Sequence, residues 1–449
     1  MFAKYQNIVK WITEKSNIYK IFLIVLFLTP DYFALSISDV LPVLSLKRVF
    51  MVICFFVYIY SFFKQKDEIK IRIKEIISNP YSKFFCAIFL ISVFGICINF
   101  SIDSLKGLMW MLVEQCALFF LFIDIMTTVS IHNTLEIVKR CLMCLLVLGI
   151  LEAVFNYNFF SLIATTDRVE QLPTVYYRMG NLRIESIFFH PLEYCLVLEL
   201  LFVFYLRKND KEISYKNIWI IMSAINVLLT YSRSAILCVG LQLVIIFFFL
   251  PSKQKKQITK ILFAVSIVVL VLIIVAPNSG ISMMVKDNVS MMSATLFGEE
   301  IENFGGNENA FGYRKHLFSL FKSEAINPIV GNGINYARNN LVPHVLSGVT
   351  FYEFDSIDNF YVLRYIELGY LGLISYVVMF VATLIYMMKD YLRTKDKTYI
   401  IFFSSCLGYM VMLFMVDAMN STKYFWFVIA LYYVYRREKG LENILLNEK

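Results

Sequence analysis

The stretch Asn327-Pro328-Ile329-Val330-Gly331-Asn332-Gly333 lies inside a long polar interval, residues 277–358, which separates two strongly apolar segments. Gly331 and Gly333 permit a tight turn and a close approach of the backbone to a neighbouring element. The interval contains too many aromatic and aliphatic residues to be a solvated tail, and loops of this length are commonly functional. We therefore expect this large outer loop to contribute to a functional site.

Outside this interval the chain is mostly apolar, since 59% of its 449 residues are hydrophobic. Apolar runs close to the length that crosses about 30 Å of hydrocarbon recur along the chain. We predict an all-α polytopic membrane protein, with one integral membrane domain over residues 1–449 and about twelve transmembrane helices. The first apolar run lacks a signal-peptide cleavage site and is expected to be a permanent span. The expected spans are residues 20–37, 47–63, 83–100, 107–126, 141–157, 191–206, 217–231, 234–250, 260–276, 359–388, 399–416 and 424–436.

The net charge of +8 is distributed along the chain in a way that disfavours a nucleic-acid partner. Basic clusters lie next to the ends of expected spans, which is the positive-inside pattern of membrane proteins. This pattern predicts that both termini are cytoplasmic and that residues 158–190 and 277–358 form extracytoplasmic loops. Lys47, Arg48 and Lys423 are exceptions on the outer side, and we expect each of them to snorkel from a span end. The clusters are 64–74, 207–216, 253–260, 389–397 and 436–439.

Arginines on the outer side of this topology stand out because basic residues are sparse there. Arg178 and Arg183 lie in the first outer loop, and Arg314 lies in the large loop. Arg233 lies in the turn Tyr231-Ser232-Arg233-Ser234 between two short apolar arms, and an arginine at membrane depth usually marks a functional site or a buried pair. Guanidinium groups bind phosphate oxygens bidentately and keep their proton. We predict that these four arginines bind a diphosphate.

Two structural interpretations of the same arginines stay open. Arg233 can snorkel to the phosphate headgroups of the membrane. Arg178 and Arg183 can instead form salt bridges with carboxylates of their own loop, with Glu185 or Glu170 as the partner.

The end of the large loop carries signals for two local structures. The spacing of apolar residues over 311–322 predicts an amphipathic helix on the outer membrane interface, ended by Asn327-Pro328. Residues 356–359 lie at the start of the span 359–388, and an Asp or Asn there is expected to be its N-cap. The exposed N–H groups of that helix end would also attract a bound anion.

Charged residues and glycines also occur inside the expected spans. Arg364 and Glu367 are spaced i,i+3, and we expect them to pair with each other. Gly369 and Gly372 permit a neighbouring helix to approach closely. Glu193 lies near the outer end of its span, where its carboxylate can face the same cavity as the arginines.

Short stretches of the chain are similar to the motifs of one enzyme superfamily. Leu229-Thr230-Tyr231-Ser232-Arg233-Ser234 matches a Thr-x-Ser-Arg element, and Arg314 with residues 327–333 matches an Arg…Pro-hydrophobic-Gly-x-Gly element. Asp358-Asn359-Phe360-Tyr361 with residues 367–372 matches a closing element, and residues 183–191 match a looser one. Over about residues 175–385, with the core motifs at 229–388, the chain resembles the O-antigen polymerase and O-antigen ligase superfamily.

The resemblance implies a glycosyltransferase with a GT-C-like membrane architecture in a bacterial inner (plasma) membrane. Its substrates would be undecaprenyl-diphosphate-linked oligosaccharides, used without a cofactor, metal or nucleotide sugar. Membrane lipid, a flippase and a chain-length regulator are the partners that the family implies. Arg233, Arg314 and Asp358 would be catalytic, with the arginines stabilising the leaving diphosphate and Asp358 orienting or deprotonating the acceptor hydroxyl. Supporting roles would fall to His190, Glu193, Asn359, Arg364, Glu367, Gly331 and Gly333.

One departure from the superfamily pattern separates its two activities. Ligases commonly carry His-Asn where this chain has Asp358-Asn359, and the Asp-Asn pair favours a polymerase that joins repeat units into O-antigen, capsule or exopolysaccharide. His344 lies in the large loop as an alternative to the missing histidine. A ligase that transfers finished glycan stays an alternative, as does a flippase or transporter of lipid-linked oligosaccharide.

Overall fold

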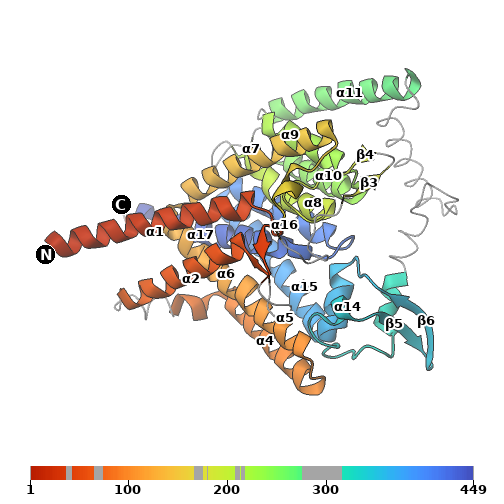
Figure 1. Ribbon diagram of the computed structural model, residues 1–449. Helices are drawn as coiled ribbons and strands as arrows, with labels where there is room; N and C mark the ends of the chain where they lie inside the picture. Colours follow the sequence, from red (N-terminus) through yellow and green to blue (C-terminus); the bar gives the residue numbers. More distant parts are fainter. Residues whose placement is uncertain are drawn as a thin grey trace.

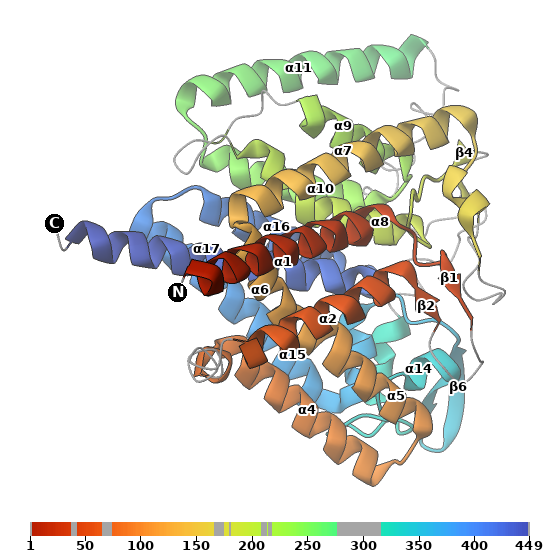
Figure 2. The ribbon, with the colours of Figure 1, turned by 60° about the vertical axis from the view of Figure 1, so that its left-hand side comes forward.

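The computed structural model is a bundle of long helices with irregular segments and short hairpins at one end (Figure 1). Both termini lie at the opposite end of the bundle, as Figure 2 also shows. The structure describes residues 2–36, 43–64, 74–165, 175–178, 181–207, 213, 218–275 and 316–447.

Helices cover most of the predicted apolar segments in chain order, because runs of apolar residues without proline satisfy their backbone groups internally. The span expected over 20–37 is shorter than predicted, since its helix ends at Leu28, before Pro30, and Ala34–Leu35 form a strand. The first half contains α1 (Phe2–Leu28), α2 (Leu46–Lys64), α4 (Pro80–Ile98), α5 (Ile102–Met111), α6 (Leu118–Val129) and α7 (Ile131–Phe155). The second half contains α8 (Pro191–Leu201), α9 (Ile218–Leu229), α10 (Arg233–Phe248), α11 (Ser252–Val275), α15 (Phe360–Thr394), α16 (Thr398–Met412) and α17 (Thr422–Asn447). Shorter helical turns are η1 (Leu112–Ala117), η2 (Phe159–Ile163), η4 (Phe202–Leu206), η5 (Phe318–Lys322), α14 (Tyr336–Asn339) and η6 (Met419–Ser421).

Three helical segments of the described chain are long and apolar enough to cross a membrane: Pro80–Ile98, Ile102–Val129 and Phe360–Thr394. Shorter apolar helices follow at Ile218–Leu229, Arg233–Phe248 and Thr398–Met412. Many large apolar side chains point away from the bundle, among them Leu90 and Ile374, which suits contact with lipid tails. The architecture is therefore that of a mostly helical membrane protein, and the number of twelve spans stays a prediction.

In the described part of the mostly helical chain, three two-stranded antiparallel pairs also occur in the segments that connect the helices. Each hairpin belongs to a connection where the chain leaves the helices, and in Figure 2 the labelled strands gather at the end opposite the termini. Strands form here because extended segments pair their backbone groups with each other where no helix continues. The pairs are β1 (Ala34–Leu35) with β2 (Leu44–Ser45), β3 (Tyr177–Arg178) with β4 (Asn181–Leu182), and β5 (Val342–Leu346) with β6 (Val349–Phe354).

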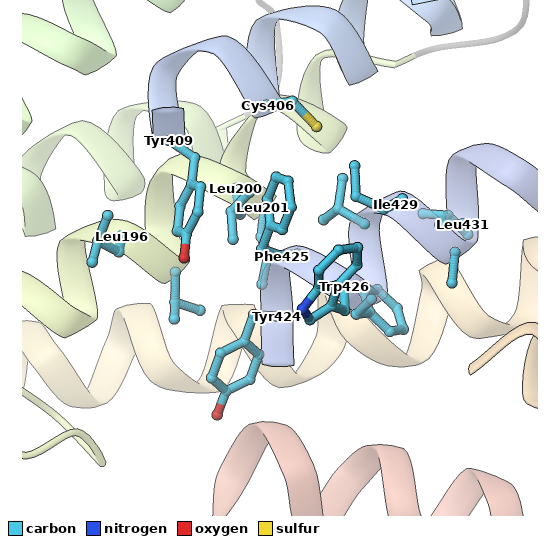
Figure 3. Close-up of a cluster of buried hydrophobic side chains, with 14 of the residues drawn as sticks. Leu196, Leu200, Leu201, Cys406, Tyr409, Tyr424, Phe425, Trp426, Ile429 and Leu431 are labelled. Atoms are coloured by element: carbon cyan, nitrogen blue, oxygen red, sulfur yellow. The ribbon is translucent and has the colours of Figure 1, made fainter. Parts of the chain in front are cut away.

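The centre of the bundle is the middle of α17, whose residues 424–431 are buried on every side. A helix that is apolar all round must be surrounded by other helices, and α6, α8 and α16 pack against it. Trp426 contacts Phe85 with ring centroids 4.7 Å apart, and Phe425 stacks on Tyr409 at 5.0 Å. Figure 3 shows the rings of Tyr409, Phe425 and Trp426 in one cluster with Leu200 and Leu201. This rigid centre fixes where the ends of the surrounding helices lie.

The amphipathic helix expected over 311–322 takes a different form. Residues 311–315 lie outside the described part of the chain, and the rest forms the short 3-10 turn η5, which ends at Lys322, before Asn327-Pro328. Leu317 and Leu320 are fully buried in a second apolar cluster, with Val342 and Phe354 of the hairpin and Val362 of α15. The described part of this segment therefore packs on protein, because the hairpin and α15 cover its apolar face.

Candidate functional site

The predicted turn between the two short apolar arms is present. Helix α9 ends at Leu229 and α10 begins at Arg233, with Ser232 as its N-cap, whose hydroxyl accepts a hydrogen bond from the backbone N–H of Ala235. Tyr231 adopts a left-handed conformation with φ 51°. The carbonyl groups of Thr230 and Tyr231 lie between the two helices and need partners from elsewhere.

Two arginines from the preceding loop supply those partners. Arg178 Nη1 donates a hydrogen bond to the carbonyl of Tyr231 at 2.8 Å, and Arg183 Nε donates to the carbonyl of Thr230 at 2.9 Å. The next helix begins with Arg233, so three of the four predicted arginines lie at one turn; all three are half-buried. We call Arg178, Arg183 and residues 229–234 the arginine turn. Arg314 lies outside the described residues.

The salt-bridge interpretation fails for one of the expected pairs. Among the described residues no ion pair joins Arg183 to Glu185, and Glu170 lies outside them. Glu185 instead accepts a hydrogen bond from Asn158 Nδ2 at 2.9 Å, and burial raises the pKa of its carboxyl to about 9. Glu185 is therefore protonated at neutral pH, so the positive charge of the arginine turn is not neutralised by this neighbour.

His190 is the N-cap of α8, the helix that follows the loop with Arg178 and Arg183. Its Nδ1 accepts a hydrogen bond from the backbone N–H of Leu192 at 3.0 Å, and Pro191 occupies the first helical position, where its missing N–H costs nothing. The imidazole packs edge-on against Tyr176, with ring centroids 4.4 Å apart. Burial, helped by the charge of Arg183, lowers the pKa of His190 to about 4. His190 is therefore a neutral structural cap beside the arginine turn.

Sequence reasoning missed a charged cluster on the outer side of α17. Asp31 Oδ2 lies 2.8 Å from Lys423 Nζ and 3.5 Å from Lys47 Nζ, and the buried Glu193 interacts electrostatically with all three residues. Lys47 is only 4% exposed, and it also donates to the hydroxyl of Tyr424 at 3.2 Å. The expectation that Lys47 and Lys423 snorkel was wrong, because both form ion pairs with the half-buried carboxylate of Asp31.

Arg48 does not snorkel either. Its Nε lies 3.3 Å from Glu114 Oε1, and its guanidinium lies 4.0 Å from the ring centroid of Trp110. The signal that could have identified these residues was already in the sequence: three basic residues on the outer side of a positive-inside protein, the same argument that singled out the arginines.

The stretch 327–333 crosses α15 where that helix is broken. Gly369 has φ 64° and ψ −166°, a conformation essentially restricted to glycine. The freed N–H groups of Tyr370 and Leu371 donate to the carbonyls of Pro328 and Ile329 at 2.8 and 3.2 Å. The N–H groups of Asn332 and Gly333 donate to the carbonyls of Ile366 and Glu367 at 2.8 and 3.0 Å. We call residues 327–335 with residues 366–371 the glycine crossing.

The glycines of this crossing are required by distance. A Cβ atom on Gly331 would lie 2.4 Å from the carbonyl carbon of Glu367, and one on Gly369 would lie 2.2 Å from that of Ile329. A Cβ on Gly333 would lie 2.2 Å from the hydroxyl of Ser104. The close approach expected from Gly331 and Gly333 is therefore present. The partner expected for Gly369 was a helix, and the structure shows a loop instead.

Glu367 links the helix to the loop that crosses it. Its Oε2 lies 2.6 Å from Arg364 Nη1, which confirms the expected i,i+3 pair, and its Oε1 accepts from the backbone N–H of Asn335 at 2.8 Å. The Arg364 guanidinium also lies over the rings of Phe360 and Tyr376, at 4.9 and 5.7 Å. Arg364 and Glu367 are thus rigidly placed.

The start of α15 is fixed by the N-cap predicted for it. Asn359 Oδ1 accepts hydrogen bonds from the N–H groups of Tyr361 and Val362, both at 3.0 Å. Its Nδ2 donates to the carbonyl of Phe414 at 2.9 Å, which ties this helix end to the end of α16. The half-buried Asp358 accepts a hydrogen bond through Oδ1 from the hydroxyl of Ser356 at 3.0 Å.

A polar cavity of about 470 Å³ opens between the glycine crossing and the charged cluster. Arg364, Glu367 and Asn335 of the crossing line one part of it, and Glu114 and Lys423 line another. Ser356 also lines it, which places Asp358 beside its rim. The predicted site residues therefore form two groups: the arginine turn with His190, and the cavity with Arg364, Glu367 and the loop glycines. Glu193 and the Asp31 cluster lie between them.

Comparison with known proteins finds a match for a segment that contains parts of both groups. Residues 218–377 match the family model of the O-antigen ligase. No curated protein matches the chain. The matched segment includes the turn at Arg233, the glycine crossing and the start of α15. This match over about a third of the chain supports a relation to the O-antigen polymerase and ligase superfamily.

Proposed function

We propose that the protein polymerises undecaprenyl-diphosphate-linked oligosaccharide repeat units on the outer face of a bacterial inner membrane. The observation that carries the proposal is that Arg178 and Arg183 both contact the turn that bears Arg233. Guanidinium groups gathered at one helix junction form a site of positive charge whose nearest buried carboxyl, Glu185, is protonated. Such a site suits a diphosphate, which needs several charge-assisted hydrogen bonds.

The reaction is a displacement at a sugar carbon. A hydroxyl oxygen of the acceptor repeat unit attacks the anomeric carbon of the donor, and the bond from that carbon to the diphosphate oxygen breaks. Undecaprenyl diphosphate leaves with the electron pair, and the arginines stabilise the charge that develops on it. Asp358 accepts the proton of the attacking hydroxyl. Arg314, from the large loop, is proposed to complete the diphosphate site.

The pair Asp358-Asn359 favours a polymerase over a ligase. The structure gives Asn359 a structural role as N-cap, with both of its side-chain atoms engaged. Asp358 is half-buried and accepts one hydrogen bond through Oδ1. A ligase that transfers finished glycan is the second candidate. The observation that favours it is the match of residues 218–377 to the O-antigen ligase family model.

The glycan profile of cells that express Arg233→Ala tests the proposal. Loss of one preorganised donor to the leaving group is expected to reduce polymerisation about 100-fold or more. Single repeat units attached to the final carrier should then replace long chains, at an unchanged level of membrane protein. Arg140→Ala is the matched control, because Arg140 is exposed on α7 and lies away from the site.

Three other results would contradict the polymerase. Normal glycan chain lengths in a well-expressed Arg233→Ala variant would show that Arg233 is not needed for polymerisation. Accumulation of long lipid-linked chains would indicate a ligase. Repeat units that stay on the cytoplasmic face would indicate a flippase or transporter.

A further inference from the structure

The two groups of charged residues at the outer end differ in their balance of charge. The arginine turn contains three guanidinium groups, and its buried neighbour Glu185 is protonated at neutral pH. Four carboxyl groups line the cavity, those of Glu114, Asp355, Glu367 and Asp417, and they outnumber the three cationic side chains on its wall. The cations are Arg338, Arg364 and Lys423.

This difference determines which ligand each place can bind. A diphosphate would be repelled by the carboxylates of the cavity wall, and the arginine turn attracts it. A polyhydroxylated molecule suits the cavity instead, because each hydroxyl both donates and accepts hydrogen bonds. Carboxylates only accept and guanidinium groups only donate, so a wall that alternates the two can satisfy many hydroxyls. The side chains of Gln115, Ser356 and Asn420 add further polar partners.

The size and rigidity of the cavity also suit a sugar. Its volume of about 470 Å³ falls within the range of roughly 300–1,000 Å³ for small-molecule sites. Glu367 fixes the cavity wall at two points, through Arg364 Nη1 at 2.6 Å and the N–H of Asn335 at 2.8 Å. Such a wall is preorganised, so little conformational entropy is lost when a ligand binds.

The position of the cavity relates it to the reaction. Ser356 lines the cavity and donates to Asp358 Oδ1 at 3.0 Å, so the residue proposed to accept the acceptor's proton lies at the rim. We infer that the cavity is a binding site for the saccharide of the acceptor repeat unit, separate from the arginine turn, which binds the donor's diphosphate. This inference rests on the proposed function and adds to it the place and the chemical class of the second substrate.

Cysteine protection in purified protein in lipid nanodiscs tests the inference. Asn420→Cys and Asp355→Cys introduce thiols at two exposed residues of the cavity wall, and Ser234→Cys introduces one beside Arg233. Labelling by a water-soluble maleimide is followed with two probes: the soluble oligosaccharide released by mild acid from the host's own lipid-linked repeat unit, and undecaprenyl diphosphate. The unsubstituted protein gives the background from the native cysteines.

The expected result is a crossed pattern of protection. At about ten times its Kd, the oligosaccharide should slow labelling about tenfold in Asn420→Cys and Asp355→Cys and leave Ser234→Cys unchanged. Undecaprenyl diphosphate should protect Ser234→Cys alone. Two cavity positions are used so that a variant that fails to fold does not decide the outcome.

The two failures are distinguishable. If the oligosaccharide protects neither cavity position while undecaprenyl diphosphate still protects Ser234→Cys, the acceptor site is wrong and the proposed diphosphate site stands. If undecaprenyl diphosphate fails to protect Ser234→Cys, the proposed function loses its donor site. Protection of the cavity positions by undecaprenyl diphosphate would overturn the separation of the two sites.

Discussion

The arginine turn and the glycine crossing position functional residues by opposite means. At the arginine turn, long side chains reach across the structure to two backbone carbonyls, and the contacts are side chain to backbone. At the glycine crossing, two backbones lie directly against each other, which is possible only because side chains are absent. The first arrangement can be weakened by removing a donor, and the second can be broken by adding one methyl group.

The largest effect is expected from Gly369→Ala. The substitution combines a backbone conformation that only glycine adopts readily with a Cβ placed 2.2 Å from the carbonyl carbon of Ile329. Backbone strain and overpacking together should lower the free energy of unfolding by about 4 kcal/mol. The measurement is thermal unfolding of purified protein in detergent.

Gly348→Ala is the matched control for this prediction. Gly348 also has a positive φ of 74°, but a Cβ atom there would meet nothing within 4 Å. Gly348→Ala should therefore lower the free energy of unfolding only by the strain of the backbone conformation, about 1 kcal/mol. Equal effects of the two substitutions would show that the close approach does not stabilise the fold.

Glu367→Ala should have the next largest effect. It removes the carboxylate that pairs with Arg364 and accepts from Asn335, and it leaves a buried guanidinium without this partner. The free energy of unfolding is expected to fall by about 3 kcal/mol. Glu367→Gln keeps an acceptor oxygen at one of the two positions, because its amide NH2 group only donates, and it should lose less than Glu367→Ala. Identical losses for Ala and Gln would show that the remaining hydrogen bond contributes little.

Arg183→Ala addresses the arginine turn. Removal of the donor to Thr230 leaves the carbonyl of a fully buried residue without its charge-assisted hydrogen bond, which should lower the free energy of unfolding by about 2 kcal/mol. Arg183→Lys should not restore the stability, because an ammonium group lacks the planar fork of the guanidinium. Arg338→Ala, an exposed arginine of α14, is the control and should leave the unfolding temperature unchanged. Full stability of Arg183→Ala would contradict a structural role at the turn.

The smallest effect is a pH dependence at His190. Its pKa in the folded protein is about 4, below the ordinary value of 6.5, so the folded state resists protonation and stability is lost as pH falls from about 6.5 to about 4. Glu185 acts in the opposite direction, because its raised pKa adds stability as pH falls from about 9 to about 4.5.

His190→Asn separates the two contributions. Asparagine keeps the N-cap hydrogen bond to Leu192 and removes the ionisable ring. Unfolding temperatures measured from pH 7 to pH 4 should therefore fall less for the variant than for the natural protein. Parallel curves would show that His190 does not titrate in this range.

Local features of the sequence predicted the local structures. The turn at 230–233, the N-cap at Asn359, the proline at the start of α8 and the Arg364–Glu367 pair are all set by neighbours within four positions, and all are present. The expected amphipathic helix and the snorkelling of Lys47, Arg48 and Lys423 were wrong. In each of these cases a partner distant in the chain covers the residue.

The sequence by itself determined which stretches of the chain form helices and which residues between them carry charge, because apolar periodicity and capping act over one or two turns. Only the tertiary structure decided which charges meet: Arg178 reaches a carbonyl 53 positions away, and Lys423 reaches a carboxylate 392 positions away. It also decided that Gly369 lies against Ile329. Such pairs depend on how the whole bundle packs around α17, and no short stretch of residues contains that information.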